Sequence, residues 1–91
     1  MNLTEEQLKE LEELASLFLP IEDIRIALEL PVHEMTELED IILFQKDNRI
    51  YQAYHKGRLQ AEIELRISIK KAALNGSNPA QSAMMNFRNN S

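Results

Sequence analysis

Cysteine is absent from this chain of 91 residues, which also has only two glycines and three prolines. Without cysteine the chain can form no disulfide, no thiolate zinc site and no cysteine nucleophile. The longest uninterrupted apolar run is the five residues Leu17–Ile21, whereas a membrane-spanning helix needs about 20. The acidic start of the chain is unlike a signal peptide, which is basic and then apolar. We therefore expect a cytoplasmic protein that has no contact with a membrane.

Residues that carry catalysis are equally sparse. Gly57 and Gly76 are too few and too far apart to build a phosphate-binding loop. The two histidines, His33 and His55, lack the spacing of a zinc site. Acidic residues occur as adjacent pairs, and neighbours in sequence do not face each other on a helix, so they are not placed for acid–base catalysis. The sequence therefore predicts a protein that is not an enzyme and that holds no metal and no cofactor.

The charges are separated along the chain. Residues 1–44 carry 12 acidic and two basic side chains, whereas residues 45–91 carry three acidic and eight basic ones. The net charge is −5. Such asymmetry predicts either a basic segment that binds an anion or two halves that attract each other, within one chain or between copies. Surface ion pairs contribute only about 0–1 kcal/mol each, so they would not dictate assembly alone.

The acidic half has apolar residues at the spacing of amphipathic helices. A capping box at Thr4 and Gln7 predicts where the first helix begins. Pro20 suits the first position of a second helix, and Pro31 predicts that helix's end. A third helix follows. The apolar faces expected for the three helices are Leu8, Leu11, Leu14, Ala15 and Phe18; then Ile21, Ile24 and Leu28; then Val32, Met35, Leu38, Ile41 and Ile42. We expect these helices to form a compact unit over residues 1–46.

A long helix is predicted from Asp47, a good N-cap residue, to Leu74, because this segment has no proline and one glycine. Residues 61–69 alternate apolar and polar, which is also typical of a strand, but no turn residues bound them. As a helix the segment has two apolar stripes. One stripe is Tyr54, Ala61, Leu65, Ile69 and Ala72, and the other is Leu59, Ile63, Ile67 and Leu74. Its own domain can cover one stripe, so we expect the second to mediate oligomerisation with further copies of the chain.

Asn75-Gly76 predicts the end of the long helix, since Gly76 can adopt the left-handed conformation that caps a helix. Asn78 and Pro79 then suit the N-cap and first position of a short helix, which should fold back as a hairpin because it is too short to be stable alone. The expected fold is thus all-α. A three-helix unit over residues 1–46 precedes a helical hairpin over residues 47–91, the oligomerisation region.

Residues 19–32 have the outline of a helix-turn-helix motif, in which Ile24, Ala27 and Leu30 are at the buried positions. A plain three-helix bundle would show the same periodicity. Two residues depart from the motif: Arg25 stands where a small residue is usual, and Glu29 stands where a turn glycine is usual. The candidate recognition helix, residues 32–40, contains four acidic residues, and its only possible positive side chain is His33.

The order of these features resembles the small terminase subunits of tailed phages and prophages, which package DNA and begin with a helix-turn-helix. Besides residues 19–32, the resemblance rests on Tyr54-His55-Lys56-Gly57-Arg58, on Glu64-Leu65-Arg66, and on Ala72-Ala73-Leu74-Asn75-Gly76-Ser77-Asn78-Pro79-Ala80. It implies a ring-forming oligomer that recognises viral double-stranded DNA. It also implies a separate large terminase subunit that carries the ATPase and nuclease, and no catalysis in this chain.

On this hypothesis, His33 and Thr36 approach base edges, while basic side chains hold phosphates. The predicted phosphate contacts are Lys46, Arg49, Lys56 and Arg58 early in the long helix, and Lys70, Lys71 and Arg88 near the hairpin tip. Equally, these bases could pair with the acidic half of a neighbouring subunit. Two alternative functions are a protein–protein interaction and oligomerisation module that does not bind DNA, and a small dimeric helix-turn-helix transcription regulator.

Overall fold

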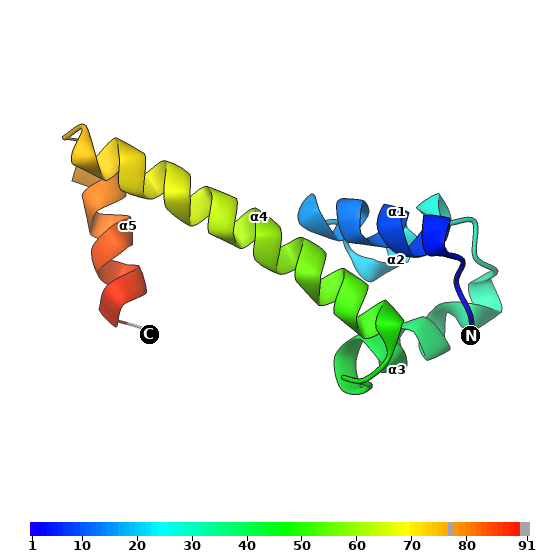
Figure 1. Ribbon diagram of the computed structural model, residues 1–91. Coiled ribbons are helices and arrows are strands. Elements are labelled where there is room, and N and C mark those ends of the chain that lie inside the picture. Colours follow the sequence, from blue (N-terminus) through cyan, green and yellow to red (C-terminus); the bar gives the residue numbers. More distant parts are fainter. Residues whose placement is uncertain (77, 90–91) are drawn as a thin grey trace. The chain divides into compact units, whose positions relative to one another are not determined.

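The computed structural model describes residues 1–76 and 78–89, and every regular element within these ranges is a helix (Figure 1). The all-α fold predicted from the sequence is confirmed. In chain order the elements are α1 (Glu5–Ser16), α2 (Ile21–Ala27), the 3-10 turn η1 (Val32–Glu34), α3 (Met35–Phe44), α4 (Arg49–Leu74) and α5 (Asn78–Asn89). The contacts divide the chain into a first unit, Met1–Ala61, and a second unit that begins at Glu62. The first unit thus includes the opening turns of α4 in addition to the residues 1–46 expected for it.

Local capping signals set where most helices begin and end. The amide of Gln7 donates to Thr4 Oγ1 at 3.1 Å and the amide of Thr4 donates to Gln7 Oε1 at 2.8 Å, which confirms the capping box. Pro20 is the N-cap of α2 rather than its first residue, and α2 ends at Ala27, ahead of Pro31. The cap expected at Asp47 is wrong by one residue, because Asn48 Oδ1 accepts from the amide of Ile50 at 2.9 Å.

The core of the first unit lies between α1, α2, α3 and the start of α4. Its largest fully buried side chains are Leu11, Ile24, Leu38 and Ile42, and Ile50 of α4 joins them. Three residues expected on the buried faces are exposed instead: Phe18 (49%), Val32 (75%) and Ala27. Phe18 and Val32 lie outside the α-helices, and Phe18 has a φ of 60°, which takes its side chain out of the helical register.

Helices α1 and α4 approach closely at Gly57. A Cβ atom built on Gly57 would collide with the carbonyl oxygen of Glu12 and would lie 3.1 Å from Ala15 Cβ. Because the obstacle is backbone, no side-chain rotation could relieve the clash. Gly57, the glycine of the Lys-Gly-Arg motif, is therefore needed for the contact between these two helices.

In the second unit, α5 folds back toward the end of α4. Gly76 has a φ of +92°, which confirms the left-handed stop predicted there. Helix α5 begins at Asn78 itself, one residue before the start expected from an Asn78 N-cap, and Ser77 lies outside the described residues. Gln81 Nε2 donates to the carbonyl of Ala73 at 3.1 Å, and the guanidinium of Arg66 lies 4.3 Å from the centroid of the Phe87 ring. These two contacts support the expected hairpin.

All four side chains in the second of the two apolar stripes of α4 are about half exposed or more. The alternation over residues 61–69 forms helix, not strand. In the first stripe Ala61 is buried, whereas Leu65 is half exposed. The exposed fractions in the second stripe are 56% for Leu59, 48% for Ile63, 48% for Ile67 and 78% for Leu74.

Among the described residues, no helix has both the length and the apolar character needed to cross a membrane.

Candidate nucleic-acid interface

The connection between α2 and α3 contains a residue in the left-handed conformation, which is common just after the end of a helix. Glu29 has a φ of +58°, the left-handed conformation that a turn glycine would adopt without strain. Beside it, the amide of Leu30 donates to the carbonyl of Arg25 at 3.0 Å. A residue with a Cβ adopts this conformation at a cost of roughly 1–2 kcal/mol. Glu29 therefore has the backbone conformation expected of the turn glycine, although the residue type differs.

The second departure, Arg25, also supports this turn. Its side chain is buried; Nη1 donates to the carbonyl of Leu30 at 2.9 Å, and Nη2 donates to Glu22 Oε1 at 2.9 Å. The hydrogen bond between the two side chains lowers the pKa of the Glu22 carboxyl and raises the pKa of Arg25. Arg25 thus links the first turn of α2 to the residue beyond the bend, which a small side chain could not do.

The outer face of η1 and α3 has the two residues predicted to approach bases, together with acidic side chains. His33 and Thr36 are exposed, as such a role requires. Glu37 pairs with the Met1 ammonium group at 2.8 Å, and this hydrogen bond raises the pKa of the ammonium. Glu39 and Asp40 are exposed one turn further along. This face is exposed and acidic, so its charge does not favour contact with a DNA backbone.

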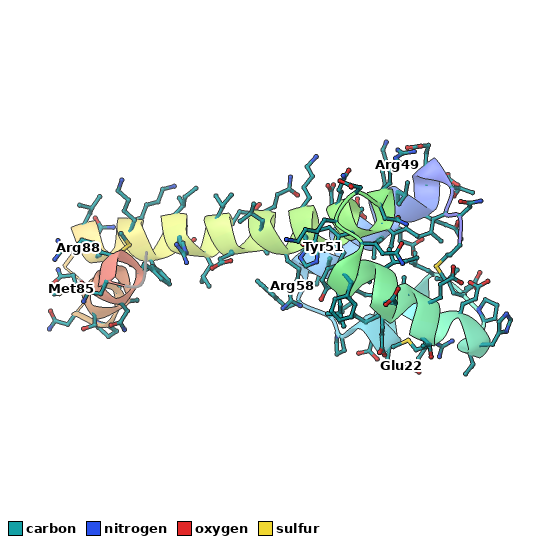
Figure 2. The ribbon with its side chains drawn as sticks, turned by 90° about the horizontal axis from the view of Figure 1, so that it is seen from below. Glu22, Arg49, Tyr51, Arg58, Met85 and Arg88 are labelled. Carbon is teal, nitrogen blue, oxygen red and sulfur yellow. The ribbon has the colours of Figure 1, made fainter. Side chains whose placement is uncertain are left out.

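Two of the predicted phosphate-binding residues pair with acidic residues of α1 instead. Arg49 donates from Nη1 to Glu5 Oε1 at 2.5 Å and from Nη2 to Glu5 Oε2 at 2.8 Å, while Lys56 Nζ lies 3.5 Å from Glu12 Oε1. Figure 2 shows Arg49 in the first unit, where α4 begins. The Arg49 pairing lowers the pKa of Glu5 and raises the pKa of Arg49. The attraction between oppositely charged halves that the sequence predicted therefore occurs, at these residues, within one chain.

The other predicted cations are differently placed. Lys46 is exposed in the loop before α4. The guanidinium of Arg58 lies 4.8 Å from the centroid of the Phe18 ring and 5.7 Å from that of Tyr54. Lys70, Lys71 and Arg88 belong to the second unit and are exposed there. The structure thus groups Arg49, Lys56 and Arg58 on the first half of α4 with their α1 partners.

His55 is exposed on α4 and lies beside two tyrosine rings of the same helix. The His55 ring lies 4.0 Å from the Tyr51 ring and 5.1 Å from the Tyr54 ring, between centroids. Its Nε2 lies 2.8 Å from the carbonyl oxygen of Ile42, so Nε2 carries a proton and donates it to α3. The spacing of Tyr51, Tyr54, His55 and Arg58 on one helix is the sequence signal for this cluster, whereas the contribution of Phe18, just beyond α1, has no local signal.

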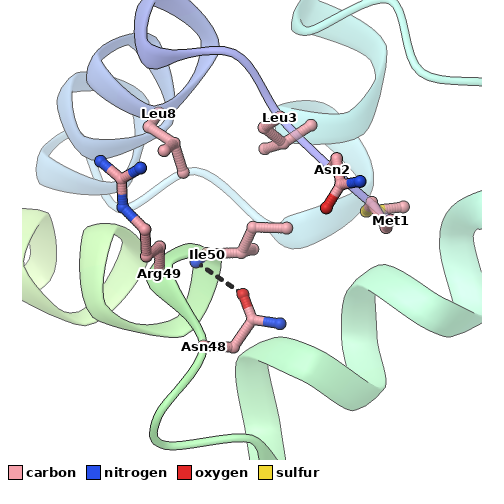
Figure 3. Close-up of a pocket in the computed structure, with 7 residues that line it drawn as sticks. All are labelled: Met1, Asn2, Leu3, Leu8, Asn48, Arg49 and Ile50. Carbon is pink, nitrogen blue, oxygen red and sulfur yellow. Dashed lines mark hydrogen bonds between the residues drawn. The ribbon is translucent and has the colours of Figure 1, made fainter.

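A cavity of about 300 Å³ lies between the N-terminal segment and the start of α4 (Figure 3). It is lined by Met1, Asn2, Leu3, Leu8, Asn48, Arg49 and Ile50. The charged groups of this lining are already paired, the guanidinium of Arg49 with Glu5 and the ammonium of Met1 with Glu37, and the other lining side chains are apolar or amide groups. Across residues 1–76 and 78–89, no three histidine or acidic side chains are grouped as metal ligands would be.

Comparisons of the whole chain with models of protein families, with curated proteins and with solved structures find no match.

Proposed function

We propose that this chain is a non-enzymatic DNA-recognition subunit of the small-terminase type, which acts in the cytoplasm as a homo-oligomer. The observation that carries the proposal is the α2–α3 connection, in which Glu29 adopts the left-handed turn conformation and His33 and Thr36 are exposed just beyond it. In a helix-turn-helix, residues at the start of the second helix contact base edges in the major groove. A separate large subunit with ATPase and nuclease activity would then act on the recognised DNA.

The charge of the first unit means that one copy should bind DNA weakly. Residues 1–61 carry thirteen acidic and six basic side chains, and phosphate contacts supply most of the non-specific affinity of DNA-binding proteins. Two of those six cations, Arg49 and Lys56, are paired with α1. We therefore assign phosphate binding to Lys46 and Arg58 in the first unit, and to Lys70 and Lys71 in the second.

The experiment that tests DNA recognition is a fluorescence-anisotropy titration of phage-derived duplex at low ionic strength, where phosphate contacts are strongest. The proposal predicts saturable binding that weakens when Thr36 is replaced by Val or His33 by Ala. Glu39→Gln should tighten binding, because it removes a negative charge from the face that meets the DNA. No binding at low salt would contradict the proposal.

We propose that copies of the chain associate through the exposed stripe Leu59, Ile63, Ile67 and Leu74. In the second unit Ile63 and Ile67 also line an apolar groove of about 290 Å³ with Met84 and Phe87 of α5. Arg66 and Lys70 border this groove, and the first unit of another copy is strongly acidic. A second copy therefore matches the stripe in both hydrophobicity and charge.

A second candidate function, a protein-interaction module that binds no DNA, is favoured by the pairing of Arg49 and Lys56 with α1. These cations have a role within the folded chain that needs no nucleic acid. On this alternative the chain assembles, and added duplex changes neither its mass nor its spectra. A dimeric transcription regulator is distinguished by stoichiometry, because the small-terminase type requires more than two copies.

A further inference from the structure

Arg58 differs from the other two arginines of the first unit in what holds its guanidinium. Arg25 and Arg49 each donate two hydrogen bonds to a glutamate, Glu22 and Glu5 respectively. Among residues 1–76 and 78–89, no carboxylate forms an ion pair with Arg58. Its guanidinium instead lies over the rings of Phe18 and Tyr54. In a unit with thirteen acidic side chains, this arginine is thus kept away from carboxylates.

The aromatic support comes partly from a strained residue. Phe18 has a φ of +60°, which is uncommon for a residue with a bulky side chain. Its ring is half exposed rather than in the core, so burial of the ring does not account for the conformation. Strained backbone of this kind often marks a binding site. Here the backbone conformation leads the chain out of α1 and leaves the ring against Arg58.

The chemistry of a guanidinium held in this way suits a phosphate group. Contact with aromatic rings satisfies no N–H group of the guanidinium, so its N–H groups stay available, and their planar arrangement matches two phosphate oxygens. Because the rings restrict the side chain before binding, less conformational entropy is lost when an anion is bound. A flexible exposed lysine such as Lys46 has neither the planar fork nor this restriction.

We propose that Arg58 binds a backbone phosphate of duplex DNA and that Phe18 and Tyr54 are positioning residues for its guanidinium. This inference rests on the proposed DNA-recognition function and adds that, of the two first-unit cations assigned to phosphate, Arg58 is the one whose side chain is positioned before binding. A carboxylate on a protein partner is the other anion that the same fork could bind, and it is the alternative that is left if the chain binds no duplex.

The test compares the affinity of the full chain for duplex DNA, and the salt dependence of that affinity, between wild type and variants of Arg58. Arg58→Ala should weaken binding about tenfold and lower the slope of log affinity against log salt by about 0.9, the value for one phosphate contact. Arg58→Lys should keep the slope but recover only part of the affinity. Phe18→Leu should weaken binding and leave the slope unchanged, because the charge is retained. Lys9→Ala, which removes an exposed charge from the same unit, is the matched control.

Circular dichroism melting of each variant shows whether the first unit is folded before its affinity is interpreted. If wild type binds and Arg58→Ala changes neither affinity nor slope, this inference is overturned while the proposed function stands. If Lys9→Ala weakens binding as much as Arg58→Ala, the loss comes from the lower positive charge of the unit and not from a specific contact of Arg58. The inference is then equally overturned. If wild type binds no duplex at all, both the inference and the proposed function fail, and the carboxylate alternative is favoured.

Discussion

At the scale of single residues, Glu29 and Arg25 explain how a bend of the helix-turn-helix kind forms without its usual glycine and small residue. Glu29 accepts the left-handed conformation at some cost in stability. Arg25 offsets part of that cost by hydrogen bonding both to Glu22 before the bend and to the Leu30 carbonyl after it. Arg25 and Glu29 are therefore structurally coupled, because the hydrogen bonds of Arg25 support the strained backbone conformation at Glu29.

Replacing Glu29 tests this account of the turn. Glu29→Gly should raise the free energy of unfolding by about 0.5–1 kcal/mol, because relief of left-handed strain exceeds the added entropy of the unfolded chain. Glu29→Ala removes the same charge and keeps the strain, so it should not stabilise the protein. Urea denaturation followed by circular dichroism measures both variants. Equal effects of the two substitutions would show that charge, not backbone conformation, matters at this position.

At the scale of elements, the contact of α4 with α1 depends on Gly57. Gly57→Ala should destabilise the first unit by about 1–2 kcal/mol, because overpacking against the Glu12 backbone outweighs alanine's higher helix propensity. Gly76→Ala is the matched control, since nothing lies within 4 Å of its Cβ and only its positive φ opposes the change. In thermal unfolding, the melting temperature of the first unit should fall for Gly57→Ala and not for Gly76→Ala, which lies in the second unit. If Gly57→Ala melts at or above the temperature of wild type, α4 does not approach the Glu12 backbone of α1 closely at Gly57.

Local signals predicted the elements well, and tertiary effects account for what they missed. The capping box at Thr4 and the glycine stop at Gly76 involve only neighbouring residues, so the sequence suffices to locate them. Phe18 was placed on a buried face because its spacing continues that of α1, but the chain leaves the helix before it. The pairing of Arg49 with Glu5 joins residues 44 apart, and charge patterning left its partner open.

The candidate site was less predictable than the fold because it depends on tertiary contacts between residues far apart in the sequence. His33 and Thr36 could be placed from the motif and are exposed as expected. Which basic residues are available for DNA could not be foreseen, because this depends on which carboxylate or ring lies beside each one. Arg58 illustrates the point, since Phe18 reaches it from the end of a different helix.

At the scale of the whole molecule, the ion pairs predict how stability depends on pH. The pKa values of Glu5 and Glu22 are lowered in the folded state by Arg49 and Arg25, from an ordinary value of 4.5. A carboxyl with a lowered pKa stabilises the fold above its unfolded value, and this contribution disappears as the pH falls through the folded value. The melting temperature should therefore decline below about pH 4.5. The melting temperature of the double variant Glu5→Gln, Glu22→Gln should decline less steeply below this pH than that of wild type. If both proteins show the same decline, the two ion pairs do not cause it.

The exposed stripe of α4 predicts the effect of charge on assembly. Ile63→Asp combined with Ile67→Asp should dissociate the oligomer while leaving helix content unchanged, because both side chains are already about half exposed. Gln60→Asp, an exposed polar position on the same helix, adds the same kind of charge outside the stripe and should leave assembly intact. Light scattering measures the mass of each variant. An assembly whose mass is unaffected by the double substitution would mean that another surface holds it together.

The most direct test of the account is the molar mass of the full chain in solution, measured at low salt without and with phage-derived duplex. The account predicts a mass of more than two 10.5 kDa chains in the absence of DNA, and a heavier complex that contains both protein and DNA when duplex is added. A mass of 10.5 kDa that duplex does not change would contradict both the assembly and the recognition of DNA.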